Sequence, residues 1–472
     1  MTKPNVLFVM VDQMAARTAR LWGGMCDTPN LDKLAQRGIL YERAYCAHPL
    51  CVPSRISTWT ASWSHNTNAQ TNQDTVPANR DTALHIWRDA GYRTALIGKN
   101  HCFDRSEYED LFDVWCEITH TGIPEGARTK GMEWPRSEDQ IAATHAIRRS
   151  MPDTGGPVAH AVTDFPLEEY STALVCAQTV RFMEQSAGQP FAAWVSIPDP
   201  HSPYEVPEQY ARLFDPDTIE LTPAPEDEFD GAPERNRLLA ELLRWPQEKR
   251  DGLREVVATY LAMIRFIDDQ LGVVMDALDR LGLADNTLVA FCSDHGDFAG
   301  EHAMMGKGGA FYDCLTHVPL VLAGPGWPCG MSVSDPVSLI DLLPTILEAQ
   351  GLRPIRQADG QPLPIASNHP PRNRIFAEYG RGAPLFGLEE MQRRNVPPGH
   401  AGILATLVER EHEGRRAMVV EGAWKAVHDP MGDVDELYDL ENDPFELTNL
   451  AEDPEQAARL ADLKAKLKEW RP

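Results

Sequence analysis

Short runs of apolar residues recur along the chain and alternate with helical patterns. The first run, Asn5–Val11, is almost continuously apolar, which is typical of a parallel strand buried on both faces. Similar runs follow at residues 93–98, 191–197, 287–292 and 318–322. Between them, segments 172–186 and 253–281 carry apolar residues at helical spacing. This alternation predicts an α/β fold with a large, mostly parallel sheet sandwiched by helices.

A change in composition near residues 367–374 divides the chain. We predict a catalytic domain over residues 1–370 and a smaller α+β subdomain over 371–472. In the subdomain, short strands are expected at Arg416–Glu421 and Trp424–His428, followed by a terminal helix at Pro454–Trp470. Two insertions, Phe103–Pro166 and Glu205–Lys249, are rich in charge and proline and are predicted to form substrate-binding walls.

The net charge of −26 argues against nucleic acid or an anionic membrane surface as a partner. The apolar run Val6–Val11 is too short for a signal peptide, and no apolar stretch reaches the roughly 18 residues of a membrane helix. Nine cysteines, an odd number thinly spread, indicate reduced thiols. We therefore expect a cytoplasmic protein whose substrate, if anionic, meets a local cluster of cations.

Polar residues follow three of the predicted strands: Asp12-Gln13, Lys99-Asn100-His101 and Asp294-His295. In parallel sheets, ligands bind at the carboxyl ends of the strands, so these side chains are expected to meet. Carboxylate and amide oxygens favour Ca²⁺ or Mg²⁺, whereas the imidazole of His295 favours Mn²⁺. The sequence thus predicts a site for one divalent cation.

The segment Cys51-Val-Pro-Ser-Arg55 matches C-x-P-S-R, the signal at which type I sulfatases oxidise a cysteine to formylglycine. Other segments resemble the same family in the same order: Gly98–His101 its G-K-x-H, Pro200–Pro203 its H-x-P, and Ser293–Asp297 its D-[HN]-G, followed by Lys307 and by a C-terminal signature around Leu437–Leu450. The resemblance spans residues 5 to about 450. It implies an alkaline phosphatase-like fold and hydrolysis of sulfate monoesters.

The resemblance also implies roles for single residues. Cys51, as formylglycine, is the nucleophile and completes a metal site with Asp12, Gln13, Asp294 and His295. Lys99 and Lys307 bind the sulfate, Arg55 and His101 hold the formylglycine, and His201 protonates the leaving group. Asn72 is expected to add a hydrogen bond to the substrate site. Many members carry Asn in place of His295, so Mn²⁺ and Mg²⁺ stay as alternatives to Ca²⁺.

The chemistry of a sulfate ester gives an independent reason for this set. Hydrolysis needs a nucleophile at sulfur, cations at the non-bridging oxygens and an acid for the leaving alkoxide. A hydrated aldehyde offers two hydroxyls, one to attack sulfur and one to expel sulfate, an exit that a thiol or serine lacks. A formylglycine-generating enzyme is therefore an expected partner during maturation.

The main alternative is a phosphonate monoester or phosphodiester hydrolase of the same superfamily. Such relatives tend to carry neutral residues at the positions of Lys99 and His101, so the charged residues here favour sulfate. A zinc phosphomonoesterase would need a second metal cluster, and a catalytically dead scaffold would have lost one of the motif residues.

The substrate alcohol and the oligomeric state stay open, with a homo-oligomer among the possibilities. Aryl, alkyl, choline and carbohydrate sulfates all fit the motifs. Four aromatic residues are candidates to stack on the substrate: Trp115, Trp134, Trp245 and Tyr204.

Overall fold

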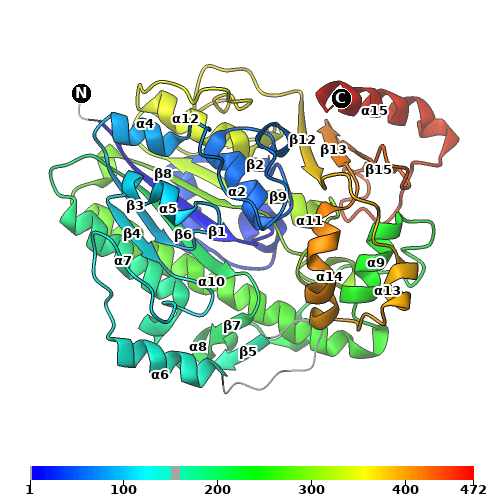
Figure 1. Cartoon of the computed structure of the whole chain (residues 1–472), viewed down its shortest axis with the longest axis horizontal. Helices are drawn as coiled ribbons and strands as arrows, with labels where there is room; N and C mark the ends of the chain where they lie inside the picture. Colours follow the sequence, from blue (N-terminus) through cyan, green and yellow to red (C-terminus); the bar gives the residue numbers. More distant parts are fainter. Residues whose placement is uncertain (1–2, 150–159, 472) are drawn as a thin grey trace.

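The computed structural model describes residues 3–149 and 160–471. Its largest element is a nine-stranded sheet in the order β10-β2-β9-β8-β1-β6-β3-β4, with β11 also beside β2 (Figure 1). The strands are β1 (Asn5–Asp12), β2 (Gly38–Tyr45), β3 (Arg93–Gly98), β4 (Val114–Glu117), β6 (Phe191–Pro200), β8 (Thr287–Ser293), β9 (His317–Ala323), β10 (Met331–Val333) and β11 (Val337–Ser338). All antiparallel pairings recorded in this sheet involve β9. The predicted, mostly parallel α/β sheet is confirmed.

Alternate residues of β1 enter two hydrophobic cores, because successive side chains of a strand point to opposite faces. Leu7, Val9 and Val11 pack with α7 (Ser171–Gln185) and α10 (Arg250–Arg280). Val6, Phe8 and Met10 pack with α2 (Cys51–Thr60), α4 (Ala83–Asp89) and α12 (Leu342–Ala349). The helices thus cover the sheet from both sides (Figure 1). Burial on both faces is the reason that the run is continuously apolar.

A second, antiparallel sheet lies near the C-terminus. It has the order β12 (Arg374–Tyr379), β13 (Arg416–Glu421), β14 (Trp424–His428) and β15 (Glu436–Asp439). The terminal helix α15 (Ala457–Trp470) packs Leu463 and Leu467 against one face of this sheet. The domain boundary after residue 370 stays a prediction.

Two helices between β12 and β13 lean away from this small sheet toward the first domain. They are α13 (Leu388–Arg393) and α14 (His400–His412), and both contact α9 (Glu234–Leu243) (Figure 1). The other helices of more than one turn are α1 (Pro29–Gln36) and α6 (Glu138–Arg149). Single turns lie at α3 (Ser64–Thr67), α5 (Arg105–Tyr108), α8 (Glu208–Ala211) and α11 (Asp313–Thr316).

The two insertions contain structure of their own. β5 (His160–Thr163), from the first insertion, pairs in parallel with β7 (Tyr204–Pro207) at the start of the second. Residues 150–159 of the first insertion lie outside the described residues. Within the described ranges, no helix is both long and apolar enough to cross a membrane.

Candidate active site

Cys51 is the first residue of α2 and is 1% exposed. Leu50 before it is extended, so the chain enters the helix at the cysteine. The backbone N–H of Val52 donates to Oδ1 of Asn72 over 3.2 Å, which satisfies one of the free amides of the first helical turn. The structure therefore places Asn72 next to Cys51.

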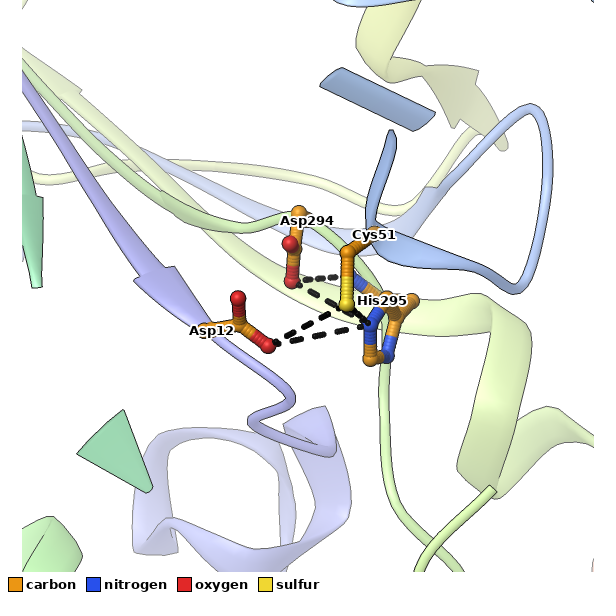
Figure 2. Close-up of side chains that lie close together, drawn as sticks. All are labelled: Asp12, Cys51, Asp294 and His295. Atoms are coloured by element: carbon orange, nitrogen blue, oxygen red, sulfur yellow. Dashed lines mark hydrogen bonds and ion pairs between the residues drawn. The ribbon is translucent and has the colours of Figure 1, made fainter. Parts of the chain in front are cut away.

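Asp12 and Asp294 leave the sheet side by side, because β1 and β8 are parallel neighbours with Val11 opposite Ser293. Each of Asp12, Cys51, Asp294 and His295 offers a ligand atom within 4.8 Å of the others, and all four are buried (Figure 2). The Cys51 Sγ lies 3.2 Å from His295 Nε2 and 3.6 Å from Asp12 Oδ1. The strand ends and the start of α2 thus meet at one point.

Arg55 binds both carboxylates of this cluster through its guanidinium group. It lies four residues after Cys51 on α2 and therefore on the same helix face. Its Nη2 donates to Oδ2 of Asp12 over 2.9 Å, and its Nε donates to Oδ2 of Asp294 over 2.8 Å. The two Oδ1 atoms stay directed toward Cys51 and His295 (Figure 2). A buried guanidinium with these partners fixes both carboxylates in one geometry.

The donor set fits a divalent cation. The Nδ1 of His295 lies 2.8 Å from the Gly296 carbonyl, so it carries the proton and leaves Nε2 as a lone-pair donor toward the cluster. That nitrogen lies 3.7 Å from Oδ1 of Asp294 and 3.8 Å from Oδ1 of Asp12. Buried, converging carboxylates with a neutral imidazole are ligands for a metal of this charge.

Gln13 and Lys307 complete one side of the cluster. Lys307 Nζ donates to Gln13 Oε1 over 2.7 Å and to Cys51 Sγ over 3.0 Å. Asp297, which the sequence analysis did not single out, accepts from Gln13 Nε2, from the Tyr204 hydroxyl over 2.6 Å and from the Gly306 backbone amide over 2.9 Å. It thereby orients both Gln13 and the turn that carries Lys307.

Lys99 lies next to Asp12, directly after the end of β3. Its Nζ lies 2.5 Å from Asp12 Oδ2 and 3.1 Å from Nε2 of His120. His120 comes from the first insertion, and its ring stacks on that of His201 with centroids 4.4 Å apart. No motif contains His120, so it is a site residue that the sequence analysis missed. In the sequence, the only indication of a role for His120 was its position in a long insertion.

His201 and His101 face Cys51 from the segments that follow β6 and β3. His201 follows β6, and its Nδ1 lies 2.5 Å from the Ser202 carbonyl, which leaves Nε2 for the site. His101 follows β3 in a left-handed backbone conformation. Both side chains are placed to hydrogen-bond Cys51. All eleven predicted site residues therefore lie in or around one cluster.

The cations of the cluster determine its electrostatics. Burial would raise the pKa of the Cys51 thiol, but Lys307 and Lys99 lower it well below its usual value. Burial would likewise raise the pKa of Asp12, but the cations around it, Lys99 foremost, hold it well below its usual range. The pKa of His120 is lowered by burial and then by Lys99. The site thus favours anionic groups at its centre and a neutral His120.

A cavity of about 270 Å³ opens onto Cys51, and its walls correct one prediction. Among the described residues, the second insertion contributes Leu243 to the lining and the first contributes none. The C-terminal region contributes Tyr379 and residues of α14. The described part of the first insertion instead packs beside the main sheet, and its His120 contacts the site residue Lys99.

The four predicted stacking aromatics do not line this cavity. Trp115 and Trp245 are buried in the hydrophobic cores, and Trp134 packs against one core with its indole N–H on the Ala127 carbonyl. Tyr204 is buried and donates to Asp297. Their apolar surface was needed for packing, which is the commoner use of an aromatic residue.

Comparisons with known proteins agree with this geometry. The sequence model of the Sulfatase family matches residues 4–352. Two relatives are each 29% identical to the chain: the uncharacterized sulfatase YidJ of Escherichia coli, over 99% of this chain and 86% of its own length, and the choline-sulfatase of Rhizobium meliloti, over 98% and 85%.

A solved structure with a similar fold belongs to the phosphonate monoester hydrolase of Agrobacterium radiobacter. It superimposes with a TM-score of 0.80 at 25% identity, over 99% of this chain and 95% of that one. The family match covers well over half of the chain, and the curated relatives extend it into the C-terminal region. The chain belongs to the sulfatase family and is a sulfuric ester hydrolase.

Proposed function

We propose that the protein hydrolyses a sulfate monoester to an alcohol and sulfate, with Cys51 converted to formylglycine and one divalent cation bound beside it. The observation that carries the proposal is the position of Cys51. It is buried between two carboxylates, the Nε2 of His295 and the ammonium of Lys307. A sulfate ester is singly charged at neutral pH, and the ammonium groups of Lys99, next to Asp12, and Lys307, next to Cys51, suit its oxygens.

Asp12, Gln13, Asp294 and His295 would hold the cation together with residue 51. Ca²⁺ is our first assignment, with Mn²⁺ and Mg²⁺ as alternatives. When bound, the cation supplies a positive charge that polarises a sulfate oxygen and favours a deprotonated nucleophile. Formylglycine supplies, as its hydrate, two hydroxyls on one carbon, so that one takes up the sulfo group and the other allows sulfate to leave. Overall, one water is consumed for each ester.

The remaining residues act on protons and charge. Arg55 and His101 would hold residue 51, and His201 would protonate the leaving alkoxide from Nε2. Burial, followed by Lys307, lowers the pKa of His201, whereas Asp12 raises it. A bound sulfate ester adds negative charge beside the ring and therefore favours its protonated form.

The second candidate is a phosphonate monoester or phosphodiester hydrolase. It is favoured by the similarity to the Agrobacterium radiobacter enzyme. Lys99 and His101 favour sulfate, because relatives acting on phosphonates tend to carry neutral residues at these two positions.

The modifying enzyme has to reach Cys51 before the chain is folded, since residues 51–55 are all buried. The test therefore uses protein co-expressed with a formylglycine-generating enzyme. We expect the peptide carrying residues 50–55 to lose the mass difference between CH₂SH and CHO. The same sample should turn over 4-nitrophenyl sulfate faster than a phosphonate monoester, and Cys51→Ala should abolish turnover without loss of fold. A strong preference for the phosphonate monoester would favour the second candidate function instead.

A further inference from the structure

The cavity above residue 51 differs in character from the reaction centre at its base. Apart from Arg410, the lining beyond the polar residues around Cys51 is mostly apolar, with Leu50, Leu243, Tyr379, Ile403, Leu404 and Leu407. Leu404 is 58% exposed, an unusual position for a leucine unless a ligand covers it. At about 270 Å³ the cavity lies just below the range of about 300–1,000 Å³ that is typical of pockets for small molecules.

The wall formed by α14 is held in place by hydrogen bonds and an ion pair to two other segments of the chain, the segment of Asn72 and α9. The Nδ2 of Asn72 donates to Glu411 over 2.6 Å, which ties the helix to the start of α2. Arg235 of α9 donates to the Arg410 carbonyl over 2.8 Å and pairs with Glu413 over 2.7 Å. The apolar surface is therefore preformed next to Cys51, and the substrate does not have to order it on binding.

The charges of the lining disfavour a cationic alcohol. Lys307 and Arg410 are cations, and the lining residues that the structure describes include no Asp or Glu. Glu411 of α14, next to the lining residue Arg410, is buried and bonded to the side chain and backbone of Asn72. A trimethylammonium group would therefore enter this cavity without a carboxylate and close to two positive charges.

The apolar lining also disfavours a sugar. A sugar sulfate would bring several hydroxyls against Leu243, Leu404 and Leu407, whose side chains offer no hydrogen bond. Each hydroxyl taken from water without a partner costs free energy. Apart from Arg410 and the Tyr379 hydroxyl, the hydrogen-bonding side chains of the lining belong to residues around Cys51, where the sulfate group would bind.

We propose that the alcohol portion of the substrate is an uncharged apolar group, an alkyl chain or an aryl ring. This inference rests on the proposed function, because it assigns the leaving group of the same reaction. In the reaction, water converts an alkyl or aryl sulfate to the alcohol or phenol and hydrogen sulfate, with no oxidant or reductant.

The test measures kcat/KM from released sulfate, using protein with Cys51 converted and Ca²⁺ present. In the series from ethyl to hexyl sulfate the leaving group is always a primary alkoxide. A change in kcat/KM therefore measures the contact of the alkyl chain with the apolar wall. We expect kcat/KM to rise about fourfold for each added methylene. We also expect 3,3-dimethylbutyl sulfate, the uncharged isostere of choline sulfate, to exceed choline sulfate and N-acetylglucosamine 6-sulfate on the order of 100-fold.

A pair of variants on α14 locates the effect. Leu404→Ser should flatten the dependence on chain length, because residue 404 lines the cavity. Val408→Ser is the matched control: Val408 lies one turn further on the same helix, is 54% exposed and is absent from the lining. It should leave the series unchanged.

Three results would overturn parts of the argument in distinguishable ways. If choline sulfate or the sugar sulfate is preferred, or chain length has no effect, the apolar assignment is wrong while sulfate hydrolysis stands. If Leu404→Ser and Val408→Ser have the same effect on the dependence on chain length, α14 does not form the apolar wall. If converted protein releases sulfate from none of these esters, the proposed function fails, and the assignment fails with it.

Discussion

His120 and Lys99 form a contact whose chemistry depends on the protonation of the histidine. Lys99 Nζ can donate to Nε2 only when the imidazole is neutral, and burial followed by Lys99 lowers the pKa of His120. The ring also stacks on His201. We therefore assign His120 as a positioning residue that keeps Lys99, the proposed sulfate-binding cation, and His201, the proposed acid, in place.

Replacing His120 separates positioning from proton transfer. His120→Ala should lower kcat/KM for a sulfate ester by about 10- to 100-fold, since a hydrogen bond to a charged group is lost. His120→Gln retains an acceptor for Lys99 and should recover most of this activity with an unchanged pH profile. A shifted profile in the Gln variant would mean that His120 itself titrates during turnover.

Replacing His201 tests the proposed general acid. His201→Ala should slow an alkyl sulfate by about 10²- to 10⁴-fold, because the alkoxide needs a proton to leave. The same variant should affect 4-nitrophenyl sulfate far less, since nitrophenolate leaves without one. Steady-state rates on both esters measure this, and equal slowing would remove His201 from the role.

At the scale of elements, the close approach of β3 and β6 determines where Lys99 lies. Gly98 has a φ of +108°, and a Cβ there would lie 1.9 Å from the Ser196 carbonyl oxygen. That oxygen accepts the Lys99 backbone amide over 2.8 Å. Only glycine lets β3 end so close to its neighbour and turn Lys99 toward Asp12.

Gly98→Ala should therefore lower the free energy of unfolding by about 3 kcal/mol or more and abolish activity. Gly188→Ala is the matched control, because Gly188 has a φ of +82° but nothing within 4 Å of an added Cβ. It should cost only about 1–2 kcal/mol, from backbone conformation alone. Chemical denaturation of both variants gives the comparison, and equal losses would mean that the contact with Ser196 relaxes freely.

At the scale of the whole molecule, one buried ionic cluster joins the two sheets. Lys425 of β14 pairs with Asp313, at the start of α11, over 2.5 Å and with Glu446 over 2.7 Å. Two acids share one cation, and burial raises the pKa of Glu446 to about 7, while Lys425 lowers the pKa of Asp313 against its burial. Near neutral pH the cluster thus favours a proton on Glu446.

This cluster should make stability depend on pH. The folded state binds a proton at Glu446 more tightly than the unfolded chain, whose carboxyl has a pKa near 4.5. Its contribution is complete below about pH 4.5 and is lost as the pH rises through about 7, by roughly 3 kcal/mol at most. From pH 5 to 8, Glu446→Gln should therefore gain in unfolding free energy relative to wild type. A difference that stays constant over this range would contradict the raised pKa.

Several elements were predictable from local pattern. β1, β3, β6, β8 and β9 are buried on both faces and therefore read as continuous apolar runs. β2 was not predicted, because Glu42 and Arg43 interrupt it where its pairing with β9 shifts register. Short strands such as β10 and β11 have too few residues for a recognisable pattern.

The sequence by itself determined the set of proposed site residues, since the proposed chemistry requires those side chains within short, ordered motifs around Cys51, Lys99, His201 and Asp294. Only the tertiary structure decided what surrounds them. His120 and the leucines of α14 reach the site from segments whose local sequence carries no chemical signal. Asp297 ends the motif Ser293–Asp297, but its role as a support follows only from its contacts. A wall or a support is defined by packing between segments distant in the chain, and no local pattern encodes such contacts.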